Sequence, residues 1–485
     1  MSKAQDLLSD LELEHILSST RTSPLEWIGN EAWSKQMSML EQLNVQAAVE
    51  ADRGGEERVR DAIVEAEKLP ILVHELLLLE SWRLNILPRI LKMGKPTSSF
   101  QVRYNFVLGT SIVSISLHIT SFNNFFFQIY MVIFNEANVC NLLETIMFGE
   151  LACENLEEAA IDLLDYAIRH LTQIASGEIV PNHNSFTSKI SNWTPGQDLP
   201  DIPIETIDEE LKRLQDEVGF QIAMKCLSIV RYMTDHMESM ILGVTTRMTI
   251  THDVPILLAQ LIEMKPWMHI SGGKTKVFHG SEWITMEDET ELPKLEAQAW
   301  IALYNLLSKK ASKDKYELHH YRLNVITKLS GQINEVISNQ LPILANLKEW
   351  LLRLNVAASD VATSAPARDL VMIEAVAEIH DSLEQRYRDK YDEIAENQKN
   401  EFLGATSEAW QKEAGRILET LDSEAAQSLM QSQKQQLSSN SNVCAQCHDP
   451  APKQRCSRCK TARYCSRECQ TKHWPRHKGR CTTAG

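Results

Sequence analysis

The chain has 485 residues, of which 43% are hydrophobic, and its formal net charge is −16. This length excludes a single hydrophobic core and predicts two to four domains, while the hydrophobic share allows a well-buried globular body. The charge is uneven, because residues 442–485 hold ten Lys or Arg against two Asp or Glu, giving this end +8 and the remainder −24. The charged N-terminal segment lacks an apolar signal region, so we expect a reducing environment.

Before residue 444 the pattern predicts an all-α body, because apolar residues recur at spacings of three and four. Composition and periodicity divide the chain into a helical body at 1–175, a linker at 176–203, a second helical part at 204–356, long charged helices at 369–430, a Gln/Ser tether at 431–443 and a cysteine-rich module at 444–481. The charged helices are expected to form a coiled hairpin that holds the module away from the body.

One motif recurs within the helical body. Pro70-Ile-Leu-Val-His-Glu-Leu is followed by Trp82, and Pro255-Ile-Leu-Leu-Ala-Gln-Leu is followed by Trp267 at the same distance; Pro342-Ile-Leu repeats only the beginning. Proline suits the first turn of a helix, where its missing N–H costs nothing. The repeat predicts an armadillo-like solenoid, and an irregular helical bundle remains the alternative. Cys140 and Cys226 lie in apolar runs and are expected to be buried as small hydrophobic residues.

The segment 104–134 contains no Asp, Glu, Lys or Arg and is long enough to span a bilayer. Amide and hydroxyl side chains interrupt it, so a transmembrane helix is the weaker interpretation. A second hypothesis is a retained intron at 102–128, because Val102-Arg103 can be encoded by GTAAGA and the Phe run ending at Gln128 by a pyrimidine tract closing in CAG. Removing these residues joins Gln101 directly to Ile129.

Seven of the ten cysteines fall near the C-terminus, in pairs at short spacing. With one histidine they form four pairs, which is the donor set of two closed tetrahedral zinc sites. We predict that one ion is held by Cys444, Cys447, Cys465 and Cys469, and the other by Cys456, Cys459, His477 and Cys481. Spacing alone does not prove this interleaved order. Closed sites leave no position for an activated water, so both Zn²⁺ ions are expected to be structural.

His473 is an alternative to His477 as the eighth ligand. His477 is preferred because its spacing to Cys481 repeats the helical step between Cys465 and Cys469, which places both members of a pair on one helix face. Two Zn²⁺ ions bound by seven thiolates lower the charge of the module from +8 to about +5, so much of its Lys and Arg offsets thiolate charge and nucleic-acid binding is not expected.

The run CSRCKTARYCSRECQTKHWPRHKGRC resembles the MYND zinc-finger family, in its Tyr-Cys step and in the Cys-Gln step followed by Trp. In peptide-binding members of that family, the matching positions line a groove for proline-containing ligands. The resemblance therefore implies partner contacts at Ser457, Gln470 and Trp474. Aromatic faces suit a preformed polyproline segment, which gives this inference a physical basis. The alternative is that Trp474 only packs on the C-terminal helix.

Segments of the body, including LEWIGNEAW at 25–33, resemble a family of MYND proteins that act in the preassembly of axonemal dynein arms. That resemblance implies a cytoplasmic, non-enzymatic adaptor. Its implied partners are a leucine-rich-repeat assembly factor, Hsp90-type chaperone machinery and dynein chains. No membrane association is expected.

Two other classes of MYND protein stay open as alternatives. SET-type lysine methyltransferases need an Asn-His-Ser-Cys segment, and PNHNS at 181–185 is the nearest counterpart, inside the predicted linker. The sequence shows no phosphate loop and no hydrolase nucleophile elbow, so no enzymatic activity is expected. A transcriptional corepressor is the other alternative, although no convincing basic nuclear signal lies outside the module.

Overall fold

The computed structural model describes residues 7–93, 104–105, 116–117, 124–181, 207–280, 282–357, 376–404, 454–456 and 463–478. The body is built mainly from α-helices, which confirms the prediction of a helical body, and its described residues also contain a three-stranded sheet and a pair of two-residue strands. Buried apolar side chains from Leu8 to Phe402 form one continuous core, which corrects the expectation that this length excludes a single core: the helices stack in series, and each buries apolar surface against its neighbours. Within these ranges no helix is both long enough and apolar enough to cross a membrane.

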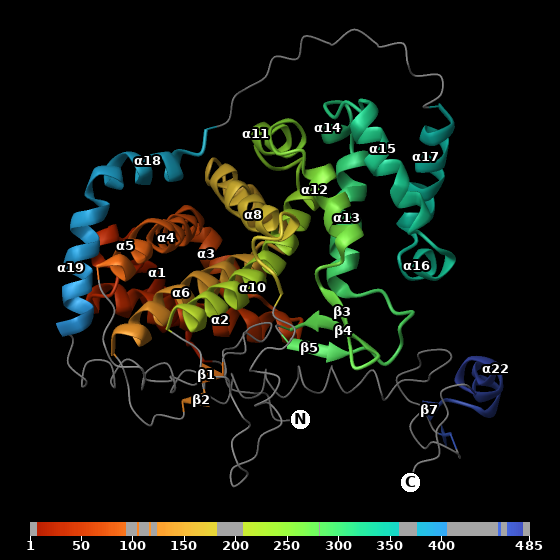
Figure 1. Ribbon diagram of the computed structural model, residues 1–485, viewed down its shortest axis with the longest axis horizontal. Helices are drawn as coiled ribbons and strands as arrows, with labels where there is room; N and C mark the ends of the chain where they lie inside the picture. The colour runs from red at the N-terminus through yellow and green to blue at the C-terminus, as the bar shows by residue number, and fades with distance from the viewer. Residues whose placement is uncertain are drawn as a thin grey trace.

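Two rows of helices run along the body in chain order. The first row contains α2 (Glu31–Arg53), α6 (Asn124–Ile146), α10 (Ile207–Asp235), α13 (Lys294–Ser308) and α17 (Ile343–Ala357), each packed against the next. The second row contains α4 (Leu69–Ser81), α8 (Ala159–Ala175), α12 (Val254–Met264) and α15 (His320–Lys328). Each second-row helix also packs on the first-row helix that follows it, so the order along the chain is an order in space (Figure 1). This arrangement favours the solenoid over the irregular bundle.

The sequence motif marks equivalent places in the second row. Pro70 and Pro255 lie in the first turns of α4 and α12, as predicted. Trp82 and Trp267, which end the two motifs, are fully buried. The third proline, Pro342, instead stands just before α17 of the first row.

The turns that lead into the second row share one feature. An acidic residue with positive φ precedes each of α4, α8 and α12: Glu67 at 53°, Glu157 at 49° and Asp253 at 48°. Residues other than Gly rarely adopt a backbone conformation with positive φ. Glu67 and Glu157 stand two residues before α4 and α8, whereas Asp253 is the N-cap of α12, so a left-handed acidic residue recurs near the start of these helices without one fixed position.

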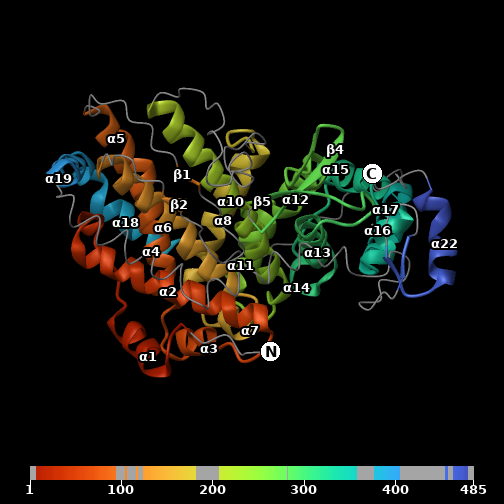
Figure 2. The same cartoon turned by 90° about the horizontal axis from the view of Figure 1, so that it is seen from below.

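Short elements precede, connect or follow the helices of the two rows. They are α1 (Asp10–Ser19), α3 (Arg58–Glu65), α5 (Leu87–Lys92), α7 (Glu150–Glu154), α11 (Leu242–Thr246), α14 (Lys310–Lys313) and α16 (Glu335–Gln340), with π turns η2 (Trp82–Ile86) and η3 (Arg247–Thr251) and 3₁₀ turns η1 (Leu25–Trp27), η4 (Leu329–Gly331) and η5 (Arg388–Lys390). Viewed from below, the body extends along the direction of the two rows (Figure 2).

A three-stranded antiparallel sheet interrupts the helical array between α12 and α13. Its strands β3 (Met268–Ser271), β4 (Lys274–His279) and β5 (Glu282–Thr285) lie in chain order. The sequence analysis missed this sheet, although Gly272 and Gly273, both with positive φ, are a strong signal for a two-residue hairpin turn. Phe278 packs edge-on against Phe220 of α10, with ring centroids 5.0 Å apart, which fixes the sheet to the body.

Helices α18 (Glu378–Tyr387) and α19 (Tyr391–Gly404) belong to the predicted segment of charged helices and lie on the body; that this segment holds the module away from the body stays a prediction. They pack against α4, α5, α6 and α8, at the end of the molecule opposite α17 (Figure 1). The indole Nε1 of Trp82 donates to Gln398 Oε1 at 2.8 Å, and Gln398 Nε2 donates to the Leu25 carbonyl at 2.9 Å. The physical reason is a buried face at helical spacing within the charged sequence, made by Leu383, Tyr387, Tyr391, Ile394 and Phe402. Residues 405–430 lie outside the described ranges.

The uncharged segment 104–134 contributes to the core of the body. Strands β1 (Tyr104–Asn105) and β2 (Ser116–Leu117) pair antiparallel, and residues 129–134 are buried in α6. Gln128 is 1% exposed, and neither of its amide atoms has a hydrogen-bond partner among the residues that the structure describes. Buried polar groups without partners are rare in native proteins. This misfit lies at the boundary of the predicted insertion at 102–128, most of which is outside the described residues.

A buried ion pair links the two rows of helices. Arg83 donates from Nε to Glu136 Oε2 at 2.6 Å and from Nη2 to Oε1 at 2.8 Å, and the Tyr166 hydroxyl donates to Oε1 at 3.2 Å. Burial alone raises the pKa of the Glu136 carboxyl, but the Arg83 charge and hydrogen bonds outweigh burial and hold that pKa at about 2. Glu136 is therefore ionised and paired inside the core.

Candidate functional site: the C-terminal cysteine-rich module

The described part of the module contains two short strands and one helix. Strands β6 (Gln454–Arg455) and β7 (Arg463–Tyr464) pair antiparallel, and α22 (Arg467–His477) follows. Ser466 begins this helix as its N-cap, because its Oγ accepts a hydrogen bond from the Cys469 N–H at 3.3 Å. The cap fixes where α22 begins relative to the preceding strand.

The described residues of the module form a very small core. Cys456 and Tyr464 are buried, and Cys465, Cys469 and Trp474 pack against them while half-buried. A cluster of this size cannot balance the entropy lost on folding, so a unit of about 40 residues needs another source of stability. Bound metal is the source that the donor set predicts.

The geometry of Cys465 and Cys469 fits a shared metal ion. Their Sγ atoms lie 3.2 Å apart, on either side of the N-cap residue. A disulfide requires about 2.05 Å between sulfurs. Two thiolates at about 2.3 Å from one tetrahedral zinc lie about 3.8 Å apart, which these side chains reach with a small rotation. The pair is therefore placed to bind one ion together.

The other predicted ligands are described only in part. Cys444, Cys447, Cys459 and Cys481 lie outside the described residues, and His477 ends α22 without a described side chain. Among the described side chains there is accordingly no group of three or more His, Cys, Asp or Glu that could hold a metal ion. The division of the eight ligands between two ions stays a prediction.

His473 has a different contact. Its Nδ1 lies 3.0 Å from the Tyr464 hydroxyl, within hydrogen-bond distance, and joins α22 to β7. A histidine that binds zinc through one ring nitrogen commonly hydrogen-bonds through the other, so this contact does not decide between His473 and His477 as the eighth ligand. The sequence analysis did not find this link, because the partners are nine residues apart on different elements.

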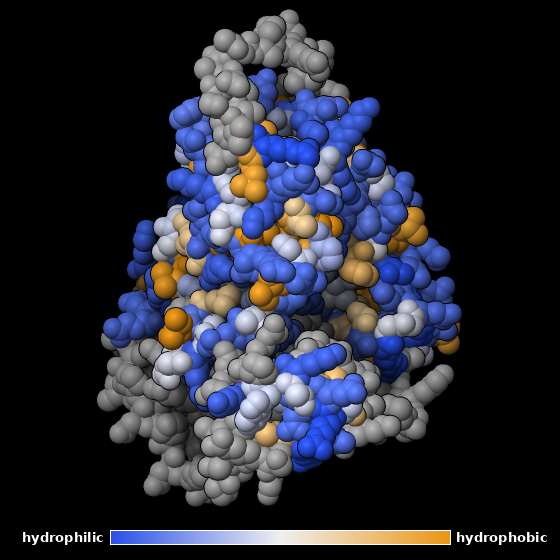
Figure 3. Space-filling view, turned by 90° about the vertical axis from the view of Figure 1, so that its right-hand side faces the viewer, coloured by the Kyte–Doolittle hydropathy of each residue, from blue (hydrophilic) through white to orange (hydrophobic). Residues whose placement is uncertain are grey.

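Two of the three predicted partner-contact residues lie together. Gln470 and Trp474 are one helical turn apart on α22, so their side chains share a face, and both are half-buried. Ser457 lies outside the described residues. In Figure 3 the described residues of the module form a largely hydrophilic patch low on the face shown. Trp474 thus packs against the small core from a helix whose exposed residues, among those described, are polar.

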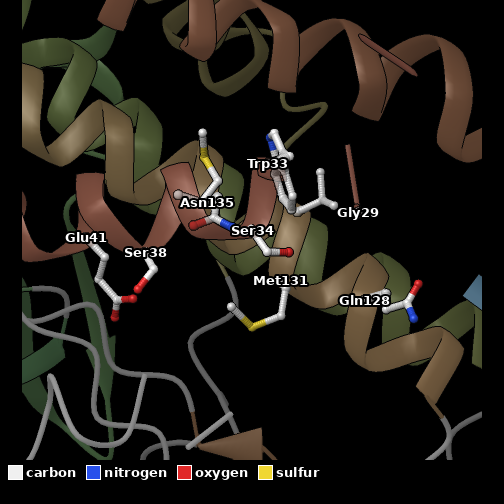
Figure 4. A pocket seen from close by; sticks show the side chains of 10 residues that line it. Gly29, Trp33, Ser34, Ser38, Glu41, Gln128, Met131 and Asn135 are labelled. Carbon is white, nitrogen blue, oxygen red and sulfur yellow. The ribbon is translucent and has the colours of Figure 1, made fainter. Parts of the chain in front are cut away.

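The body contains a cavity between α2 and α6, lined by residues that include Trp33, Ser34, Met131 and Asn135 (Figure 4). Its volume of about 10 Å³ accommodates one water molecule. This space is far below the size of pockets that bind substrates or cofactors. The cavity therefore does not compete with the module as a candidate functional site.

Comparison with known proteins agrees with this choice of site. Residues 444–481 match the family model described as MYND finger, with the same limits as the predicted module. Over 97% of its length the chain is 26% identical to the "Zinc finger MYND domain-containing protein 10 homolog" of Drosophila melanogaster, and the match covers 98% of that protein. No solved structure matches the chain.

Two plant proteins match within a much shorter stretch. The "Ubiquitin C-terminal hydrolase 15" of Oryza sativa subsp. japonica is 62% identical over 39 residues, and the "Ubiquitin carboxyl-terminal hydrolase 15" of Arabidopsis thaliana is 58% identical over 41 residues. Each match covers 8% of this chain and 4% of the plant protein, so this likeness carries no inference about hydrolysis. The chain carries a MYND finger, a type of protein-interaction module, and over nearly its whole length it is similar to the zinc finger MYND domain-containing protein 10 homolog.

Proposed function

We propose that this chain is a non-enzymatic adaptor whose MYND finger grips a proline-containing segment of one partner protein while the helical body holds another. Its place of action is the cytoplasm, in the preassembly of axonemal dynein arms. By the family resemblance, its partners are a leucine-rich-repeat assembly factor, Hsp90-type chaperone machinery and dynein chains. The full-length homology to a MYND-containing relative supports an adaptor in which body and finger work together.

The observation that carries the proposal is the position of Trp474 and Gln470. Both lie on one face of α22, next to the core of Cys456 and Tyr464, and neither is fully buried. An aromatic ring held in this way offers a rigid apolar face beside an amide that can donate and accept hydrogen bonds. A polyproline segment has carbonyl oxygens and ring surfaces that suit this pair.

The two zinc ions are proposed to be structural. The predicted ligand pairs would hold the strands and α22 in the orientation that presents Trp474, and all eight positions are protein side chains. The body supplies length and rigidity, since a solenoid offers an extended surface that a small finger lacks. Each part can then bind its own partner.

The test is affinity purification of the full-length protein from ciliating cells, comparing wild type with the variant Gln470→Ala/Trp474→Ala. Lys472→Ala serves as a matched control, because Lys472 is exposed on the same helix. We expect the double variant to keep its zinc and lose one defined set of proteins, and the control to lose none. Recovery of the same partners by wild type and double variant would show that the body binds them and that the groove does not.

A further inference from the structure

The face of α22 that carries Gln470 and Trp474 also carries two positive charges. Arg467, Gln470, Trp474 and Lys478 follow one another at offsets of zero, three, seven and eleven residues. At about 100° per residue these four positions fall within an arc of about 80°. Arg467 begins the helix and Lys478 is its C-cap residue, so one cation stands at each end of the face.

The two cations are placed differently from the other lysine of the helix. Arg467 and Lys478 are exposed, whereas Gln470 and Trp474 between them are half-buried. Lys472 is also exposed, but lies about 140° around the helix from Arg467. The face of α22 that carries Gln470 and Trp474 therefore has a cation at each end, whereas Lys472 lies on a different face of the same helix.

The placement of Arg467 is unfavourable for the helix itself. A positive side chain in the first turn opposes the partial positive charge of the helix N-terminus, by roughly 0.3–1 kcal/mol at an exposed site. Glu468 beside it offsets part of this cost. Arg467 is thus unfavourable for the start of the helix, and it lies at the end of the face that carries the predicted contacts. We infer from this that Arg467 serves recognition of a partner.

We propose that the partner segment gripped by this face is a proline-containing peptide with acidic residues on both sides of its proline-rich centre. Eleven residues of α-helix span about 17 Å, which a polyproline helix covers in about five to six residues. The inner acidic residues are accordingly five to six positions apart. This inference rests on the proposed function of the MYND finger and specifies the class of ligand that it takes.

The probe is a fluorescein-labelled peptide of sequence Glu-Glu-Pro-Pro-Leu-Pro-Pro-Glu-Glu, compared with the same peptide carrying Gln in place of every Glu. Binding to zinc-loaded full-length protein is measured by fluorescence anisotropy at two ionic strengths. We expect the Glu peptide to bind about tenfold more tightly at low salt, and this preference to shrink as salt rises, because exposed charges are screened.

Variants then assign the preference to the two ends of the face. Arg467→Glu/Lys478→Glu is expected to abolish or reverse the preference for the Glu peptide while its zinc content stays unchanged. Lys478→Glu and Lys472→Glu are a matched pair on one helix, and only the first is expected to weaken binding of the Glu peptide by more than about twofold.

The outcomes separate this inference from the function on which it rests. If both peptides bind equally well and Gln470→Ala/Trp474→Ala abolishes binding of both, the groove exists and the acidic specificity is wrong. If neither peptide responds to Gln470→Ala/Trp474→Ala, the proposed function itself is wrong. If the charge-reversed variant binds both peptides normally but sediments differently from wild type, the cations serve contacts between copies of the chain, which also overturns the inference.

Discussion

The helical body and the MYND finger differ in what stabilises their folded states. The body packs two rows of helices around one core, with residues as large as Trp82, Trp267 and Trp300 fully buried. The finger has two buried side chains in its described part, Cys456 and Tyr464. Burial of apolar surface therefore stabilises the body, whereas the finger is expected to need bound metal to hold its two short strands and α22 in place. We therefore expect that either part can be unfolded or destabilised while the other stays folded.

Removal of zinc has the largest expected effect and is confined to the finger. Structural zinc contributes on the order of 10 kcal/mol per site, so chelation or Cys465→Ser should unfold residues 444–481. Zinc release, measured with a chromogenic chelator, should approach two ions per chain in the wild type. The thermal unfolding of the body, followed by circular dichroism, should stay within a few degrees. As a control, Cys140→Ser in the buried core should lower the melting temperature of the body and release no zinc.

Breaking the buried ion pair tests the body in the same way. Arg83→Met leaves the Glu136 carboxylate buried without its cation and should reduce the free energy of unfolding by about 3–5 kcal/mol in urea denaturation. Replacing both partners by Leu should recover part of this loss, because no unpaired charge remains. The exposed pair of Arg353 and Glu349 is the control, and Arg353→Ala should cost less than about 0.5 kcal/mol. An equal loss from both arginines would contradict the role assigned to burial.

The contact between α19 and the N-terminal turn can be broken by one methyl group. Gly29 has φ of +94°, and a Cβ at this position would lie 2.3 Å from the ring of Phe402. Gly29→Ala should therefore destabilise the body by about 1–3 kcal/mol and loosen α19 from it. Gly54 also has positive φ but has open space around it, so Gly54→Ala measures the backbone strain alone. Hydrogen exchange of residues 391–404 should rise only in the first variant.

Acid should weaken the body through Asp165. Burial raises the pKa of this carboxyl, but hydrogen bonds from His252 and Arg247 outweigh burial and bring the pKa down from its ordinary value to about 2. A lowered pKa stabilises the folded state above the unfolded-state pKa, and this contribution disappears as pH falls from about 4 towards 2. Asp165→Asn should lower stability at pH 7 and flatten its decline over that range, as urea titrations at several pH values can measure. An unchanged slope would mean that Asp165 does not couple to folding.

The smallest expected effect concerns the suspected insertion. Deleting residues 102–128 removes the first turn of α6 and the unpartnered amide of Gln128, and keeps the buried residues 129–134. We therefore expect the deletion variant to fold with a melting temperature equal to or above that of the full chain, and to bind as much zinc. A large loss of stability would identify these residues as part of the fold. Transcripts that always retain the segment would also contradict the intron hypothesis.

Local signals in the sequence were sufficient for the features that depend on near neighbours. The prolines that begin α4 and α12 were identified correctly, because the rule concerns a single helical turn. Cys140 and Cys226 are fully buried, as their apolar neighbours predicted. The limits of the finger followed from ligand spacing, since each pair must reach one ion.

Features that depend on distant contacts were not predictable from one sequence. The apolar face of α18 and α19 has ordinary helical spacing, and nothing in that spacing tells which surface covers it. The pairing of Arg83 with Glu136 joins residues 53 positions apart, and the Tyr464 and His473 contact joins two elements of the finger. The hairpin at Gly272 and Gly273 was missed for another reason, because helical periodicity on both sides outweighed a local turn signal.

The return of α18 and α19 changes how the helical array can come apart. A linear solenoid frays from its two ends, because each terminal repeat has a neighbour on one side only. Here the N-terminal turn at Leu25 is tied to Gln398, and Asp162 of α8 accepts a hydrogen bond from the backbone N–H of His380, so residues from far along the chain hold both the first turns and a second-row helix. A truncation before residue 376 would therefore do more than remove the finger, since it would also free the N-terminal end of the array. Loss of the chain after residue 404 would leave that end tied.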